Sequence, residues 1–268
     1  MGSGQFSISA GFHESSGRKL FNLALEPEVD SPRGAILFLH PFAEEMHMAR
    51  RNVAAQARAL AAAGYRVLLP DLTGCGDAQG QFSDATWEVW REDANNAMAL
   101  LGAGGDAPMI LWGLRLGGLL AASLAAERRD VARLLLWQPV LNGEQQVDQF
   151  LRLRTAASVI DEGAVFDRNT LWNELRAGRP LEIAGYELSP ALAREVARVR
   201  LAELTPHCPV HWLEVGAQMA RPSRGVVESW RERGLEVSAN AVDGNPFWRN
   251  HDAPLNTRLQ RATLEALS

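Results

Sequence analysis

The sequence predicts an α/β fold built on a mostly parallel sheet of eight strands. Continuous apolar runs bounded by turn residues recur along the chain, and helical patterns separate them. Such runs are typical of strands that are buried on both faces of a parallel sheet. Strands that alternate with helices indicate right-handed βαβ units. The 268 residues fit one large domain of this type, so we expect a single domain over residues 1–268.

The elements follow one another in a regular order. Two alternating stretches, Phe6–Phe12 and Leu20–Leu25, predict an antiparallel hairpin. The four buried strands expected next are Ala35–His40, Val67–Pro70, Met109–Trp112 and Leu134–Trp137. Their helices are expected near 44–63, 86–101 and 116–128. The last elements are a strand at Val210–Val215, a helix near 224–233, a strand near Glu236–Val242 and a helix near 256–267. The predicted order is a hairpin, four strand–helix units, an insertion and two more strand–helix units.

Residues from about 142 to 206 form this insertion, because they interrupt the alternation. Three stretches are helical in pattern, and no clear buried strand accompanies them: Gln149–Arg154, Leu171–Arg176 and Ala191–Val199. The insertion follows the sixth strand, at the edge of the sheet where ligand sites of α/β proteins form. We interpret it as a helical lid; simple packing on the domain edge is the alternative.

Composition and charge exclude several classes of protein. The net charge is −5 and no basic run concentrates positive charge, which argues against nucleic-acid binding. No apolar run reaches the roughly 18 residues that a transmembrane helix needs. The first residues do not resemble a signal peptide. The two cysteines cannot form a disulfide framework, which favours a reducing cytoplasm. We expect no metal and no cofactor.

The most informative motif is Met-Ile-Leu-Trp-Gly-Leu-Arg-Leu-Gly-Gly at residues 109–118. An apolar strand enters a Gly-x-?-x-Gly turn and a small-residue helix follows, which is the layout of a nucleophile elbow. Arg115 stands where a hydrolase carries its serine. A guanidinium has donors only and cannot attack an acyl carbon. We expect neither Cys75, in a glycine-rich loop, nor Ser123, within the helix, to replace the nucleophile.

Backbone groups of an oxyanion hole are retained in the sequence. One donor is the N–H of Leu116, which directly follows the elbow residue. The second donor comes from the loop His40-Pro-Phe-Ala-Glu-Glu45. Pro41 has no N–H, which leaves Phe42 or Ala43. Such donors could hold an oxyanion or a bound carboxylate; an ordinary helix start and a tight turn are the alternative.

A catalytic acid and a histidine are harder to find. The loop after Val210–Val215 contains no carboxylate, so Glu144, after the sixth strand, is the substitute candidate. His251 is the candidate base, although it comes several residues later than the usual place in this fold. Phe247 and Trp248 stand where the imidazole is expected, and we predict that they line a pocket, as does His40; packing against the lid is the alternative for the two aromatic residues.

Arg115 needs a compensating partner, because a cation at a helix N-terminus opposes the helix dipole and an elbow residue has a strained backbone. A carboxylate is one possibility, and the candidates are Glu44, Glu45 and Asp243. An anionic ligand is the other. A paired Arg115 would plug the position of the nucleophile, whereas an unpaired one would receive a carboxylate or phosphate.

Several blocks together resemble the exosortase A system-associated hydrolase 2 family. They are His40–Met46 with Arg50-Arg51, Asp71–Gly80, Trp112–Gly118, Leu136–Val140, Gln149–Arg154, Gly185–Ser189 and Pro246–Trp248. The resemblance runs from about residue 33 to 250. It implies an α/β-hydrolase fold and a bacterial gene neighbourhood for exopolysaccharide production and exosortase protein sorting. The arginine at the elbow belongs to the family pattern, so no catalytic serine is carried over.

Three functions stay open at this point. The first is an enzyme that acts on an acyl or ester substrate without serine, using water activated by His251 or a carboxylate. The second is a catalytically inactive homologue that binds an anionic acyl, sugar or peptide ligand. The third is a scaffold that acts through protein contacts. The sequence leaves the substrate, the partner proteins and the oligomeric state open.

Overall fold

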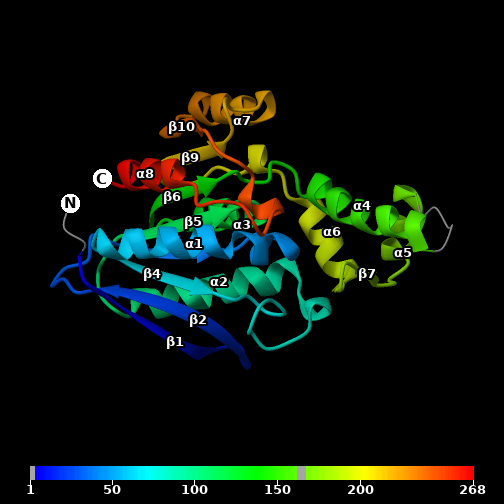
Figure 1. The fold of residues 1–268 in the computed structure, drawn as a ribbon, viewed down its shortest axis with the longest axis horizontal. Coiled ribbons are helices and arrows are strands. Elements are labelled where there is room, and N and C mark those ends of the chain that lie inside the picture. Colours follow the sequence, from blue (N-terminus) through cyan, green and yellow to red (C-terminus); the bar gives the residue numbers. More distant parts are fainter. Residues whose placement is uncertain (1–3, 162–166) are drawn as a thin grey trace.

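The computed structural model describes residues 4–161 and 167–268 and confirms the predicted fold class. Eight strands form one sheet in the order β1-β2-β4-β3-β5-β6-β9-β10, with helices packed against it (Figure 1). β1 (Phe6–Ser15) and β2 (Arg18–Pro27) pair antiparallel, and β2 also pairs antiparallel with β4. The other pairs in this sheet are parallel.

The predicted hairpin is present, but its strands are longer than the alternating pattern indicated. Ser16 and Gly17 form a two-residue turn with φ of 49° and 81°. Positive φ at both positions is the geometry whose twist matches that of the flanking strands. Pairing therefore continues to Ser15 and Arg18 on either side of the turn. The residues near the turn are polar, so the alternation of apolar and polar residues does not reveal these last pairs.

The central strands are buried because helices cover both faces of the sheet. The parallel strands are β3 (Gly34–Leu39), β4 (Tyr65–Pro70), β5 (Met109–Leu114), β6 (Val131–Trp137), β9 (Val210–Val215) and β10 (Val237–Val242). Helices α1 (Glu44–Ala62) and α8 (Thr257–Ala266) pack on the face that Ile36 and Trp112 share. Helices α2 (Trp87–Gly102), α3 (Leu116–Glu127) and α7 (Arg221–Glu232) pack on the face of Leu37 and Leu111.

The carboxyl ends of β3, β4 and β5 meet at one edge of the sheet, because the three strands are parallel neighbours. The turns after β3 and β5 lead into α1 and α3 at this edge. Ligand sites of open α/β sheets form at this kind of edge. The segments that could build a site are therefore the starts of α1 and α3 and the loop after β4.

The insertion after β6 contains three helices, as predicted, and also two short strands. These elements are α4 (Gly143–Asp161), α5 (Arg168–Arg176), β7 (Leu181–Ile183), β8 (Tyr186–Leu188) and α6 (Pro190–Arg198). The two strands are not evident from the sequence, because three-residue strands are too short to show a periodic pattern. The prediction of a fourth strand–helix unit before the insertion was wrong, since β6 leads directly into the insertion. Residues 162–166 of the expected insertion lie outside the described residues.

Hydrogen bonds fasten the insertion to the core near the start of α2. The carboxylate of Glu195, in α6, accepts a hydrogen bond from the backbone N–H of Trp87 at 2.8 Å. Ser189 Oγ donates to the carbonyl of Ala85 at 3.0 Å. A carboxylate is favourable at this position because the N-terminus of a helix carries partial positive charge. The helices of the insertion thus lie together at the right-hand end of the view in Figure 1.

No helix among residues 4–161 and 167–268 is both long and apolar enough to cross a lipid bilayer. In the same part of the chain, the side chains of His, Cys, Asp and Glu do not gather in any group of three suited to hold a metal ion.

Candidate functional site at the carboxyl edge of the sheet

Arg115 lies at the sharp turn between β5 and α3. Its backbone has φ 56° and ψ −118°, a conformation that non-glycine residues rarely adopt and that stores strain. The N–H of Arg115 donates to the carbonyl of Trp137 at 3.1 Å, and the carbonyl of Arg115 accepts from the N–H of Val140 at 3.0 Å. The end of β6 thus holds this turn in place. The local geometry is that of a strand-to-helix elbow with an arginine at its tip.

Two glycines make the close approach at this elbow possible. A Cβ atom on Gly113 would lie 2.4 Å from the carbonyl oxygen of Gly117, and one on Gly117 would lie 2.0 Å from that of Leu39. Only glycine avoids these clashes. The start of α3 therefore packs directly against the end of β3. This contact brings Arg115 beside the turn that leads into α1.

The turn into α1 has nearly the same backbone geometry as the elbow. Ala43 has φ 48° and ψ −125°. Within the described part of the chain, the backbone N–H groups of Leu116, Phe42 and Ala43 donate to no acceptor. Free N–H groups at two adjacent helix starts can stabilise a negatively charged oxygen. The loop predicted to supply the second oxyanion donor therefore has free donors.

Three elements hold the side chain of Arg115, which is only 8 % exposed. Nε donates to Glu45 Oε1, in α1, at 3.1 Å. Nη2 donates to Gln146 Oε1, in α4, at 3.2 Å. The guanidinium carbon also lies 5.7 Å from the ring centre of Trp248, within the range of a cation–π contact. Sequence reasoning missed Gln146, because only the folding of the insertion brings it to the elbow.

The carboxylate of Glu45 is incompletely satisfied. Its Oε2 atom is buried and has no hydrogen-bond partner among the described residues. Burial raises the pKa of Glu45, and this effect outweighs the nearby guanidinium of Arg115 and the charge of Arg249, both of which lower it. The two side chains share one hydrogen bond, so the contact lacks the two parallel bonds of a bidentate pair. Arg115 is nevertheless partnered within the protein.

The other two candidate partners of Arg115 have different contacts, which corrects the prediction for them. Glu44 accepts from the hydroxyl of Tyr186 at 3.3 Å and lies 3.4 Å from His251 Nε2. Asp243 forms an exposed ion pair with Arg258. Glu44 and Glu45 are neighbours on a helix, and consecutive helical positions project in different directions. Only one of them can face the elbow, and it is Glu45.

The two candidate catalytic residues lie in contrasting surroundings. The side chain of His251 is 63 % exposed, and its ion-pair partner among the described residues is Glu44. Glu144 lies in the first turn of α4, where Arg168 and Arg200 each bind one of its carboxylate oxygens. This places Glu144 in an ion cluster of the insertion, whereas the elbow contacts come from Gln146 two residues later.

The residues expected to line a pocket occupy three different places. Trp248 stacks near Arg115 and lines a cavity at the elbow. Phe247 is 1 % exposed and packs in the core against Trp137, with ring centres 6.1 Å apart, so its expected role at a pocket surface was wrong. His40 lines a separate cavity between α1 and β2. Burial lowers the pKa of His40, whose Nε2 accepts from the N–H of Leu72 at 3.4 Å.

Cys75 and Ser123 are both buried. Burial and the charges of Asp71 and Asp93 raise the pKa of the Cys75 thiol far above its ordinary value. The nucleophile in thiol chemistry is the thiolate, and this environment disfavours its formation.

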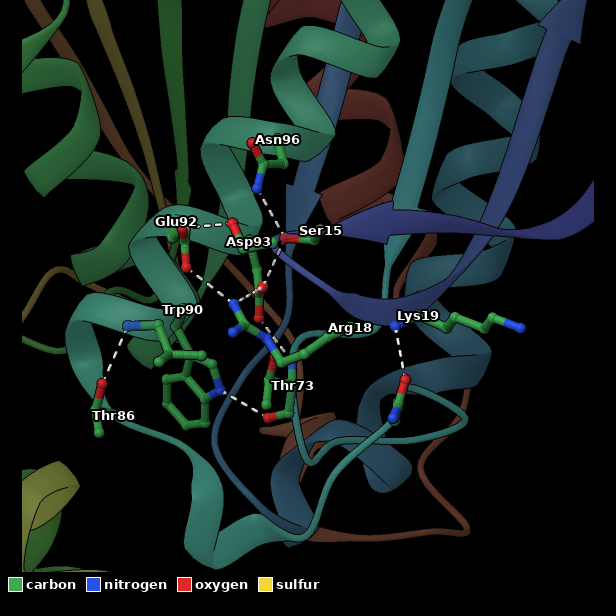
Figure 2. Close-up of polar contacts among 12 residues, drawn as sticks. Ser15, Arg18, Lys19, Thr73, Thr86, Trp90, Glu92, Asp93 and Asn96 are labelled. Atoms are coloured by element: carbon green, nitrogen blue, oxygen red, sulfur yellow. Dashed lines mark hydrogen bonds and ion pairs between the residues drawn. The ribbon is translucent and has the colours of Figure 1, made fainter.

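A buried polar network positions the loop after β4, which carries Cys75. Asp93, on α2, accepts hydrogen bonds from Ser15 Oγ at 3.0 Å, from Arg18 Nη2 at 3.2 Å and from the N–H of Thr73 at 2.9 Å. Trp90 Nε1 donates to the carbonyl of Thr73 at 3.0 Å. Figure 2 shows how these groups converge from the hairpin, the loop and α2. The network therefore fixes the loop from two sides, the hairpin and α2.

A cavity of about 630 Å³ opens between the elbow region and the insertion. Its size falls within the roughly 300–1,000 Å³ range of small-molecule sites. The walls come from α1, from α4 and from the loop after β10. The lining residues are Phe42, Glu44, Glu45, Met48, Gln146, Gln149, Phe150, Arg152, Leu153, Ala184, Trp248 and Arg249. Arg152, Arg249 and Met48 were not anticipated, since nothing in the sequence separates them from ordinary surface residues.

The strand order and the elbow after β5 define a protein of the α/β-hydrolase superfamily. The chain belongs to the family described as serine aminopeptidase, S33, which matches residues 30–209. Hydrolases of this superfamily carry serine at the elbow, and this chain carries Arg115. The comparison with curated proteins found no match.

Solved structures share the fold at low sequence identity. Est1E from Butyrivibrio proteoclasticus with bound ferulic acid is 18% identical, with a TM-score of 0.66 and coverage of 96% of each chain. DcsB in complex with its substrate analogue is 17% identical, with a TM-score of 0.66 and coverage of 98% of each chain. A lipase in its open form is 18% identical, with a TM-score of 0.66, and the match covers 97% of this chain and 98% of the lipase. These likenesses support the fold.

Proposed function

We propose that this protein is a catalytically inactive α/β-hydrolase homologue that binds a small anionic ligand in the cavity above its elbow. The observation that carries the proposal is the state of Arg115. Its guanidinium fills the position of the nucleophile and is held there by Glu45, Gln146 and Trp248. A group with donors only cannot form an acyl intermediate.

The residues at the other positions of a serine triad support the same proposal. Trp248 stands in the loop after β10, where the histidine is expected. After β9 the chain reads Gly216-Ala-Gln-Met219 without a carboxylate. Glu214, within β9, accepts from the N–H of Ala220 at 2.7 Å and thereby closes the loop into α7. Serine-type catalysis would need all of these roles to be filled.

The cellular setting follows from the resemblance to the exosortase A system-associated hydrolase 2 family. We propose a bacterial, cytoplasmic protein of an exopolysaccharide and exosortase locus, with the insertion over residues 142–206 acting as a lid in a single domain. The blocks that carry the resemblance include the elbow and the segment Pro246–Trp248. Trp248 lines the cavity and lies over the guanidinium of Arg115 at the elbow, so these motifs lie at or beside the proposed ligand site.

An enzyme that works without serine is the second candidate, because the N–H groups of Leu116 and Ala43 are free in the described structure. In such an enzyme these groups would stabilise an oxyanion, while His251 would activate water with Glu44 as its partner at 3.4 Å. The same free groups also suit a bound carboxylate, so they fit both candidates. Arg115 favours the binding protein.

A fluorophosphonate probe tests the central claim. We expect no covalent labelling of the native protein, with a commercial serine esterase labelled in parallel as the positive control. Mass spectrometry that locates the probe on a serine would refute the claim that serine chemistry is absent. Turnover of p-nitrophenyl esters that is lost in a His251→Ala variant would instead favour the enzyme without serine.

A further inference from the structure

Two arginine side chains line the 630 Å³ cavity and form no hydrogen bond or ion pair within the described residues. Arg152 belongs to α4 of the insertion, and Arg249 ends the 3-10 helix Phe247–Arg249 in the loop after β10. Both side chains are exposed. The positive charge of Arg249 lowers the pKa of the neighbouring Glu45. The cavity therefore has a cation on each of two opposing structural units, the insertion and the core.

The remaining charges of the cavity have partners within the protein. Arg115 and Glu45 offset each other at the elbow. The carboxylate of Glu44 accepts a hydrogen bond from the hydroxyl of Tyr186 and lies close to His251 Nε2. Among the charged side chains that line the cavity, Arg152 and Arg249 therefore have no partner within the described residues, and an anionic group of a ligand can supply one.

The surface between these charges is apolar. Phe42 and Phe150 meet edge to face, with ring centres 4.9 Å apart. Met48, Leu153 and Trp248 complete the apolar lining. Leu153 is 48 % exposed. Exposed apolar surface of this kind is stabilised when a ligand removes it from water.

On the basis of the binding function proposed above, we propose that the cavity takes an amphipathic carboxylate with an acyl chain. The carboxylate is received by Arg152 and Arg249, and the chain lies over Phe42 and Phe150. Arginine suits this role because its planar guanidinium donates paired hydrogen bonds to carboxylates. Arg152 and Arg249 thus form the anion receptor, whereas Arg115 already has partners within the protein.

This arrangement predicts that the ligand joins the insertion to the core. The carboxylate would bridge α4 and the loop after β10, both of which contact Arg115, α4 through Gln146 and the loop through Trp248. A ligand that binds only the folded, assembled site stabilises it by mass action. Binding should therefore slow amide hydrogen exchange in α4 as well as in the loop after β10.

Isothermal titration with three probes of equal chain length tests the ligand class. We expect octanoate to bind about tenfold more tightly than methyl octanoate, since a hydrogen bond to a charged group adds roughly that factor, and octylamine to bind more weakly than either. The variants Arg152→Gln and Arg249→Gln should each weaken octanoate binding by about tenfold and leave methyl octanoate binding unchanged. Arg261→Gln, on the exposed face of α8, is the matched control and should bind as the wild type does.

The outcomes separate this inference from the proposed function. Equal binding of acid and ester, binding led by the amine, no binding of any probe, or full octanoate affinity in both variants would each overturn the carboxylate site. Those results would not affect the claim that serine chemistry is absent, which the fluorophosphonate probe tests independently. Labelling of a serine would overturn the proposed inactive homologue even if octanoate bound as expected.

Discussion

Arg115 and Glu45 meet at the carboxyl edge of the sheet, with Nε 3.1 Å from Oε1. They come from two helix starts whose preceding residues share an unusual backbone conformation, with φ 56° at Arg115 and 48° at Ala43. The contact thus joins the elbow to the oxyanion loop. A side-chain pair therefore spans the two turns that carry the free backbone N–H groups.

Restoring serine at the elbow should not create a hydrolase. We expect Arg115→Ser to leave p-nitrophenyl ester hydrolysis at background level, because a serine without a general base remains a weak nucleophile. The release of p-nitrophenol measures this directly, and circular dichroism checks that the variant is folded. Robust activity would mean that His251 and a carboxylate can assemble a triad after all.

The Glu45 carboxyl should give stability a distinct pH dependence. Because the pKa of Glu45 is raised above its ordinary value of 4.5, the folded protein binds this proton more tightly than the unfolded chain. The stabilisation from Glu45 is then fully present below the ordinary value and is lost as pH rises through the raised pKa. Urea unfolding from about pH 4 to about pH 8 should show wild type losing stability relative to Glu45→Gln across this window.

The matched control for that series is Glu232→Gln, at an exposed position near the end of α7. Its free energy of unfolding should run parallel to that of the wild type. A wild-type advantage over Glu45→Gln that grows with pH would contradict the raised pKa, since it would mean that the ionised form of Glu45 is the favoured one in the folded protein.

Asp93 should be far more important for stability than its neighbour Glu92. Asp93 is fully buried and accepts three hydrogen bonds, including one from Arg18, so Asp93→Ala leaves several donors unpaired. We expect a loss of about 3 kcal/mol in the free energy of unfolding. Glu92→Ala removes a partly exposed partner of the same arginine and should cost below about 1 kcal/mol. Equal losses of stability in the two variants would contradict the claim that Asp93 is the more important of the two residues.

Gly117 should tolerate no side chain, whereas another helical glycine should accept one. Gly117→Ala would place Cβ 2.0 Å from the carbonyl oxygen of Leu39, and relieving this overlap should cost about 3 kcal/mol or more. Gly225, within α7, has open space around its Cβ position. There an alanine should stabilise the protein by roughly 0.5–1 kcal/mol because it favours the helix. Thermal unfolding of both variants, expected to shift in opposite directions, measures the contrast.

Much of the architecture was predictable because buried strands leave a simple pattern. Helices on both faces force continuous apolar runs such as β5 and β9, and the prediction of Val210–Val215 matches the observed strand. The short strands β7 and β8 were missed because their stability comes from a turn at Ala184 and Gly185 with positive φ. Alanine at such a turn gives no strong local signal, unlike an Asn-Gly or Asp-Gly pair.

The candidate site was predictable only in part. The elbow could be located because glycines and an apolar strand mark it, and the adjacent loop follows from the parallel order of the strands. The choice among Glu44, Glu45 and Asp243 could not be made, since it depends on the direction in which each side chain leaves its element. Gln146, Arg152 and Arg249 reach the cavity through the packing of the insertion, which no local pattern encodes.

The sequence by itself determined that an arginine occupies the elbow of an α/β sheet, because backbone geometry at that turn requires glycines at fixed spacing and an apolar strand before it. Only the tertiary structure decided what the arginine does there. Its pairing with Glu45 depends on α1 and α3 starting side by side, and that arrangement arises from the close approach of Gly117 to the end of β3. Long-range packing of this kind sets which charges meet, and local sequence does not.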